Sequence, residues 1–314
     1  MSTLASLLNS FRAVGVILIL TACGYILSEL GWIQVEVKRF LSRYLMRFAV
    51  PVMCVYSLRT NLTLELIRSS WTLLLIPTVS SFALYALALV IGRRLRLDAK
   101  QNSVFAIMCS VSNAMFIGYS MCMELFGEAC VPYVMTYYLI NTAFSQLIGV
   151  AGIRRAGGQD GGTLRETAIA FFKTPSILGV LAGVLLILTD WTPPALVMSC
   201  ARYINNTVTP LALLTAGNII HEIGLKNLRL DKVLSLTMLF RFLLAPGISL
   251  ALCAAFGVTG LARSVLVVQS AMPVLTQAVV AASEYGGDER LAAQGVAIST
   301  LACFAVIPAL MLLL

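Results

Sequence analysis

The chain has 314 residues, of which 59% are hydrophobic and only 11% are charged, and its mean hydropathy is +0.92. A soluble domain carries about 25% charged residues, so this composition excludes an ordinary soluble protein and favours a membrane protein. The net charge of +8 does not indicate a nucleic-acid partner, because its distribution along the chain follows membrane topology instead.

Ten apolar segments have roughly the length, about 20 residues, that a helix needs to cross the hydrocarbon core of a bilayer. Runs such as 181–188 are apolar throughout, without the alternation typical of a transmembrane β-strand, so the segments are predicted to be helices. The ten predicted spans are 8–28, 39–58, 70–92, 101–125, 130–153, 175–192, 194–219, 232–256, 262–283 and 290–314.

Basic residues indicate the orientation of these spans. If the N-terminus lies outside, fourteen Lys and Arg residues fall in cytoplasmic loops, among them Lys38, Arg229 and Arg290, and four fall outside. Short loops on the cytoplasmic side are enriched in basic residues, so both termini are expected outside the cytoplasmic membrane. Residues 1–10 have no charged region of the kind that opens a signal peptide, so the first segment is expected to be a true span.

The longest loop, 154–173, contains a polar run from Gly157 to Gly162 and divides the chain into two halves of five spans. An odd number of spans in each half gives the halves opposite orientations, the arrangement of many secondary transporters. We therefore predict one membrane domain made of two inverted repeats, 1–153 and 174–314, joined by a cytoplasmic linker. Two pairs of landmarks share one offset of 159 residues: Pro51 with Pro210 (210 − 51) and Gly127 with Gly286 (286 − 127).

The ninth span has a polar sequence around a proline in its middle. Pro273 lacks an N–H group, and its neighbours Thr276 and Gln277 are polar side chains that are costly in hydrocarbon unless they are paired. Breaks of this kind persist only inside protein or beside water. The pattern predicts a discontinuous helix that carries a binding site.

The fourth span has a matching stretch, in which Ser112, Asn113 and Gly118 loosen the helix. Interhelical hydrogen bonding is the alternative explanation for Asn113. In the fifth span Tyr138 and Asn141 share one helix face and are candidates for lining the same site, with an interfacial belt as the alternative for the tyrosine.

With these motifs in order, the chain resembles the auxin efflux carrier family over nearly its whole length. The residues that carry the resemblance are Phe48–Pro51, Ser112–Gly118, Leu125–Gly127, Lys173–Ile177, Pro210–Leu213, Gly217, Arg241, Pro246, Ala271–Pro273 and Glu284–Gly286. The resemblance implies ten helices in two inverted five-helix repeats, with broken helices 4 and 9 that cross near mid-membrane. It also implies anionic organic substrates at the crossing, and a scaffold of spans 1, 2, 6 and 7 that often forms a homodimer.

One departure concerns the fourth span. The family usually has Gly-x-Pro there, whereas this chain has Gly118-Tyr119-Ser120. The local helix geometry at this point is therefore left open.

Two half-helices that cross would point their N-terminal ends at one spot, where free N–H groups favour an anion such as a carboxylate. Arg241 is the only deeply placed cation and is a candidate charge partner, although pairing with a carbonyl or snorkelling is the alternative. The predicted substrate-binding residues are Ser112, Asn113, Gly118, Tyr138, Asn141, Met272, Pro273, Thr276 and Gln277, with Pro51, Pro210 and Pro273 as helix breaks.

The leading interpretation is a secondary transporter for small organic anions, such as mono- or dicarboxylates, with no catalytic residue, metal or cofactor. A membrane-embedded enzyme, such as a lipid-linked transferase, is the first alternative, and it would need carboxylates or histidines clustered at a membrane face. A sensor built on a carrier fold is the second alternative. The substrate, the direction of transport (efflux or uptake) and the coupling ion stay open.

Overall fold

The computed structural model describes residues 3–61, 71–158, 164–224 and 228–314. Arg68, Lys226 and residues 159–162 of the glycine-rich run lie outside these ranges. Every regular element in the described ranges is a helix, and the β-type pairing found there is an isolated bridge between Ser112 and Val274. The prediction of an all-helical protein is confirmed for this part of the chain.

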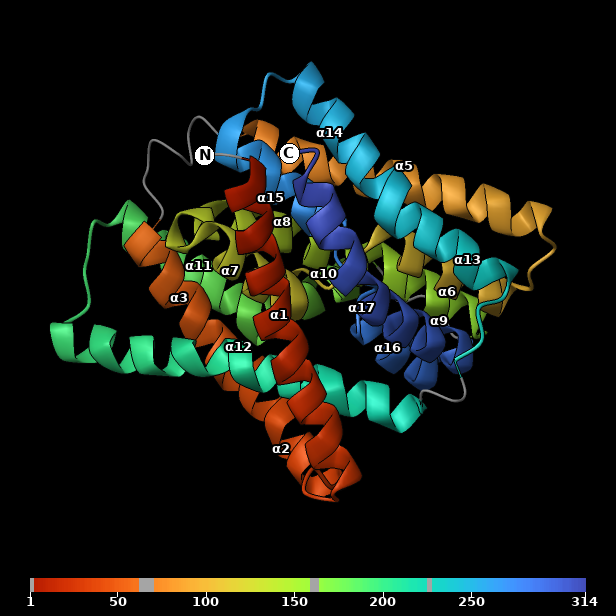
Figure 1. The fold of residues 1–314 in the computed structure, drawn as a ribbon, viewed down its shortest axis with the longest axis horizontal. Helices are drawn as coiled ribbons and strands as arrows, with labels where there is room; N and C mark the ends of the chain where they lie inside the picture. The colour runs from red at the N-terminus through yellow and green to blue at the C-terminus, as the bar shows by residue number, and fades with distance from the viewer. Residues whose placement is uncertain (1–2, 62–70, 159–163, 225–227) are drawn as a thin grey trace.

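The first half contains helical segments over all five spans predicted there (Figure 1). They are α1 (Thr3–Glu29), α2 (Val35–Tyr44), η1 (Leu45–Ala49), α3 (Val50–Asn61), α5 (Trp71–Arg94), α6 (Ala99–Ser110), η2 (Ala114–Gly118), α7 (Tyr119–Phe126), η3 (Glu128–Cys130), α8 (Val131–Phe144), η4 (Ser145–Val150) and α9 (Ala151–Ala156).

The second half begins with a short helix that the sequence analysis placed in the linker. The segments are α10 (Leu164–Phe172), α11 (Pro175–Leu188), α12 (Ala195–Ile223), α13 (Lys232–Leu239), η6 (Phe240–Leu244), α14 (Ala245–Ala255), α15 (Gly260–Ser270), α16 (Gln277–Tyr285) and α17 (Glu289–Met311). The beginning of α1 and the end of α17 lie close together in Figure 1.

Four helical stretches are long and apolar enough by themselves to cross a membrane: Arg12–Glu29, Trp71–Arg94, Lys232–Ala255 and Glu289–Met311. Others fall short for local reasons. Breaks divide 101–125 and 262–283 into shorter helices, and α12 carries Arg202, Asn205 and Asn206 within its length. A multi-pass helical membrane protein follows from these spans, while the count of ten crossings stays a prediction.

Wide π-helical turns adjoin two of the prolines within helices. The π turn η1 ends two residues before Pro51, and η6 ends two residues before Pro246. A proline ring clashes with the preceding turn of a regular α-helix, and a wider turn relieves the clash. The chain therefore continues as helix through Pro51, as it does through Pro210 inside α12, so neither of these two predicted break positions interrupts its helix.

Glycines allow the backbones of α1 and α12, which cross in Figure 1, to approach closely. A Cβ atom on Gly217 would lie 2.0 Å from the carbonyl oxygen of Thr21, and one on Gly24 would lie 2.2 Å from that of Leu214. Helices in membranes pack through small residues of this kind, because lipid supplies no hydrophobic driving force between them.

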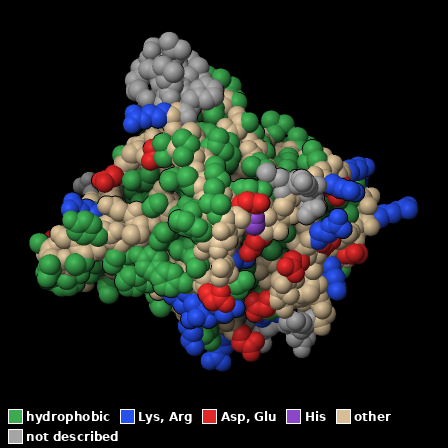
Figure 2. Space-filling model, turned by 60° about the horizontal axis from the view of Figure 1, so that its bottom comes forward, with side chains coloured by type: hydrophobic (Ala, Val, Ile, Leu, Met, Phe, Trp, Pro, Cys, Tyr) green, Lys and Arg blue, Asp and Glu red, His purple; other side chains and the backbone are tan. Residues whose placement is uncertain are grey.

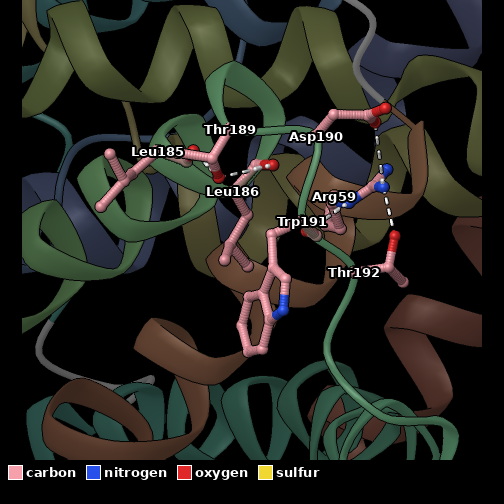
Figure 3. A network of polar contacts seen from close by, with 7 residues as sticks. All are labelled: Arg59, Leu185, Leu186, Thr189, Asp190, Trp191 and Thr192. Carbon is pink, nitrogen blue, oxygen red and sulfur yellow. Dashed lines mark hydrogen bonds and ion pairs between the residues drawn. The ribbon is translucent and has the colours of Figure 1, made fainter.

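Helix α3 packs on α11 in the same way, since a Cβ on Gly179 would lie 2.5 Å from the carbonyl oxygen of Pro51. The turn that follows α11 is tied to the end of α3 by Arg59 (Figure 3). Its guanidinium donates to the Trp191 carbonyl at 3.1 Å and to the Thr192 hydroxyl, and it lies 3.7 Å from the Asp190 carboxylate. These contacts hold the tight hairpin between α11 and α12.

Large hydrophobic side chains cover much of the outer surface. Leu185, Leu196 and Leu243 are 59%, 77% and 63% exposed. Figure 2 shows such side chains over much of one face, with charged side chains of both signs gathered on another part of it. Apolar exposure on this scale is explained by contact with lipid.

We expect Gly217→Ala to lower the thermal stability of the detergent-solubilised protein, because the added methyl group overlaps the α1 backbone, an overpacking that costs about 1–3 kcal/mol. Gly247→Ala is the matched control, because a Cβ there meets no atom within 4 Å. Thermal unfolding monitored by size-exclusion chromatography makes the comparison. Equal melting temperatures for the two variants would contradict the close α1–α12 contact.

Candidate functional site

The fourth span is broken between two helices. Asp98 begins α6 by accepting a hydrogen bond from the Gln101 N–H, and α6 ends at Ser110. Val111 is extended, with φ −117° and ψ 135°, and the helix resumes at Ala114. The side chain of Asn113 caps the new helix by accepting from the Phe116 N–H at 3.3 Å. The break that the polar sequence predicted is confirmed.

The ninth span is broken in the same manner. Helix α15 ends at Ser270 and α16 begins at Gln277, with Pro273 in the intervening segment. Because proline has no N–H, this segment cannot continue the α15 hydrogen-bond ladder at that position.

The two breaks meet each other. Ser112 and Val274 form an antiparallel bridge, and the Asn113 N–H donates to the Pro273 carbonyl at 2.8 Å. The Asn113 side chain donates to the Thr276 hydroxyl at 3.0 Å. The N-terminal ends of the second half-helices, Ala114–Phe126 and α16, are thereby joined side to side.

Asn141 of α8 satisfies the backbone of the first break. Its side-chain oxygen accepts from the Ser112 N–H at 3.0 Å, and its amide nitrogen donates to the Ser112 carbonyl at 2.8 Å. Val274 in the second break donates to the Ser299 hydroxyl of α17 at 2.9 Å. Buried backbone groups need partners of this kind.

Arg241 of η6 is fully buried and bonds backbone carbonyls of both broken helices. It donates to Ser270 at 2.6 Å, to Met272 at 2.7 and 3.1 Å, and to Cys109 at 3.4 Å. Arg241 therefore pairs with backbone carbonyls, which the sequence analysis gave as an alternative to its role as a charge partner. Arg241 does not line the cavities described next.

A cavity of about 1030 Å³ lies in front of the crossing. Asn113, Thr276 and Gln277 contribute to its wall together with Phe116, while Lys38, Arg229 and Arg290 contribute three cationic side chains. Other parts of the wall come from α12 and η1 and are mostly apolar, with Leu45, Met46, Ala212, Ala216, Ile219 and Ile223.

A smaller cavity of about 20 Å³ continues from the same residues and is also lined by Tyr138, Asn141 and Ser145. The Tyr138 hydroxyl donates to the Ser176 hydroxyl of α11 at 2.7 Å. Five predicted site residues therefore border the two cavities: Asn113, Tyr138, Asn141, Thr276 and Gln277.

The other predicted site residues lie behind the wall. Ser112 and Met272 are fully buried, and Pro273 is buried within the crossing. Gly118 faces Gln269, whose side-chain oxygen would lie 2.3 Å from a Cβ at this glycine. These four residues shape the crossing, and none of them borders either cavity.

Of the residues at the family's usual Gly-x-Pro position, Gly118 ends the π turn η2, and Tyr119 and Ser120 continue as regular α-helix. Tyr119 begins α7, and its hydroxyl donates to the Asn205 side chain of α12 at 3.5 Å. Ser120 donates to the Phe116 carbonyl one turn earlier, at 2.8 Å. The irregular geometry lies instead at 111–113 and in the π turn η2.

The sequence analysis missed the charged side chains at the cavity wall. Lys38 of α2 forms an ion pair with Glu222 of α12 at 2.5 Å, and both side chains border the cavity. The sequence analysis assigned Lys38, Arg229 and Arg290 to cytoplasmic loops. That common side of the membrane was the signal in the sequence that could have indicated their proximity.

Comparison with known proteins places this helical, cavity-bearing protein in a transporter class. The chain belongs to the membrane transport protein family, the auxin efflux carriers, whose model matches residues 10–158 and 163–311. It is 22% identical over 290 residues to an uncharacterized transporter of Methanocaldococcus jannaschii, and the match covers 91% of this chain and 92% of the relative. The resemblance drawn from the motifs is confirmed.

We expect a cysteine at Gln277 to react with a water-soluble maleimide and one at Met272 to stay unreactive, because Gln277 borders the cavity and Met272 is fully buried. Both variants are made after replacing the exposed Cys23 and Cys200 with serine. Mass spectrometry of the intact protein measures the labelling. Equal labelling at both positions would contradict the assignment of Gln277, and not Met272, to the cavity wall.

Proposed function

We propose that this protein is a carrier that moves small organic anions, such as mono- or dicarboxylates, across the cytoplasmic membrane by alternating access. One observation carries the proposal: two half-helix N-terminal ends meet at the wall of a large cavity, at Asn113 and at Thr276–Gln277. Each end contributes about half a positive charge, and positive charge of this kind favours a carboxylate.

The cationic side chains of the cavity wall support an anionic substrate. Lys38, Arg229 and Arg290 raise the local concentration of anions, although Glu222 and Glu289 on the same wall offset part of their charge. Nearer the crossing the wall offers amide and hydroxyl groups from Asn113, Thr276 and Gln277. These groups can orient a substrate by hydrogen bonds without adding charge.

The lengths and spacings of the helices support ten crossings in two inverted repeats. Helix α6 and helix α15 end 160 residues apart (270 − 110), and α7 and α16 end 159 apart (285 − 126). Gly127 and Gly286, which follow the last two, both have positive φ, 67° and 75°, although only Gly286 has the left-handed ψ of a standard C-cap. Two halves of this kind, with five crossings each, are the arrangement that the proposal requires.

In the proposed orientation both termini lie outside and the cavity opens to the cytoplasm. Lys38, Arg229 and Arg290, which the basic-residue rule assigns to the cytoplasm, border the cavity. The cysteine at Gln277 tests this orientation as well: an impermeant thiol reagent should label it in inside-out vesicles and not in intact cells.

The proposed mechanism is uniport, with efflux driven by the membrane potential. The side-chain oxygens of Ser112, Ser270, Thr276 and Gln277 are neutral, so the proposal includes no strongly bound coupling ion. An inside-negative potential contributes about 2.3 kcal/mol per charge per 100 mV to outward movement of an anion.

We expect uptake and efflux in proteoliposomes for one or more members of a panel of radiolabelled mono- and dicarboxylates, and much weaker binding of the matching amides. Loaded right-side-out vesicles should release the substrate faster when the inside is made negative. The experiment is repeated with proton and sodium gradients at zero potential. Efflux that ignores voltage and follows either gradient would replace uniport by coupled transport, and an absence of carboxylate transport would reject the anion proposal.

We expect Asn113→Ala to lower carboxylate transport about tenfold or more, because it removes the helix cap and the bond to Thr276 at the cavity wall; the lost cap alone costs about 1 kcal/mol of stability. Asn218→Ala is the matched control. Asn218 is as buried as Asn113 and bonds Ser28 at 3.0 Å, but it does not line the cavity. Equal transport by the two variants would move the substrate site away from the crossing.

A further inference from the structure

We propose that Arg241 makes the crossing electropositive, so that the site selects anions although the described residues that line the smaller cavity at the crossing include no cation. The inference rests on the proposed function, because it explains how that site would attract a carboxylate. It assigns to Arg241 a positioning and electrostatic role, exerted through the backbone of the two broken helices.

The charges of the helix ends at the crossing nearly cancel one another. Four half-helix ends meet there: α6 and α15 end at the crossing, and Ala114–Phe126 and α16 begin there. Each C-terminal end carries about half a negative charge and each N-terminal end about half a positive one. The four ends together are therefore close to neutral, and by themselves they give a carboxylate little net attraction.

Arg241 lies at the C-terminal ends of the two broken helices. Its guanidinium bonds three carbonyls: that of Cys109, the next-to-last residue of α6, that of Ser270, the last residue of α15, and that of Met272, two residues into the second break. One full positive charge thus compensates the two negative ends. What remains at the crossing is the pair of positive N-terminal ends, which point at the cavity.

Among the described residues, no buried carboxylate cancels the positive charge of Arg241. Among the residues whose burial the structure describes, Arg241 is the only charged side chain that is buried. The ion pairs found in the described ranges join Lys38 to Glu222, Arg59 to Asp190 and His221 to Glu29, and none of them involves Arg241. The charge of Arg241 is therefore offset only by the helix ends that it contacts, and charges in a low-dielectric interior interact strongly.

The proposal is tested by measuring the electrostatic potential at the cavity wall, which requires no knowledge of the substrate. A cysteine at Gln277, in the background without Cys23 and Cys200, is treated with two thiol reagents of similar size. One is the anionic sulfonatoethyl methanethiosulfonate and the other is the cationic trimethylammonium-ethyl compound. The ratio of the anionic to the cationic rate reports the local potential.

Arg241→Gln should lower this ratio about tenfold, because it removes one unit charge from a low-dielectric site. Arg241→Lys, which keeps the charge, should leave the ratio within about twofold. A cysteine at Thr189, in the exposed turn after α11, is the control position, where the ratio should not change in any variant.

A second pair of variants keeps Arg241 in place. Thr237 lies one turn before Arg241, and its side chain contacts Cys109, whose carbonyl Arg241 bonds. Thr237→Asp adds a carboxylate beside the guanidinium, whereas Thr237→Asn has nearly the same shape without the charge. We expect the tenfold fall in the ratio with aspartate and not with asparagine.

Equal ratios for Thr237→Asp and Thr237→Asn would overturn the proposal, even if Arg241→Gln does not fold. The outcomes also separate this inference from the proposed function. A fall in the ratio without transport of any carboxylate in the panel would reject the proposed function and leave the electrostatic role standing. Carboxylate transport without a fall in the ratio would reject only the role of Arg241.

Discussion

The hydrogen-bond requirement of backbone groups in an apolar medium is the constraint on which this structure depends. Each broken helix frees N–H and carbonyl groups that water cannot reach in hydrocarbon, and each unsatisfied group costs several kcal/mol. The crossing meets the requirement internally: Asn113 bonds Pro273, Asn141 holds Ser112, and Arg241 holds the carbonyls of both helix ends. The breaks are therefore fixed by their mutual contact and by three neighbouring helices, and Pro273 alone does not determine them.

Much of this crossing was predictable because its chemistry is local. Proline in the ninth span, and serine and asparagine in the fourth, are costly inside a membrane helix, and the structure has a break at each place. Asn141 was selected because it shares a helix face with Tyr138, and both border the smaller cavity. Signals of this kind are visible in sequence because the residue type itself is unsuited to a continuous helix.

The partners that complete the crossing could not be predicted, because their roles depend on contacts between distant segments. Ser299 is one small polar residue within a largely apolar helix, and nothing around it indicates a bond to Val274. For Arg241 the sequence left a charge partner and a carbonyl partner equally open, and only the arrangement of α6, α15 and η6 distinguishes them. The continuity of the helices at Pro51 and Pro210 was missed because π turns and tertiary packing tolerate a proline that local rules treat as a break.

The distribution of polar bonds also bears on how the cavity, which we propose opens to the cytoplasm, could open to the other side of the membrane. Bonds within the crossing are many and involve a full charge. Two neutral bonds join its surroundings to α11 and α12: Tyr138 of α8 bonds Ser176, and Tyr119 of α7 bonds Asn205. A neutral hydrogen bond contributes only about 0.5–1.5 kcal/mol, and apolar side chains such as those of Ala212 and Ile219 can slide past a neighbour without leaving a polar group unpaired. Movement of the crossing against α11 and α12 therefore breaks weaker contacts than separation of the two broken helices would. In the carrier mechanism proposed above, the charge of Arg241 would move together with the carbonyls that it holds.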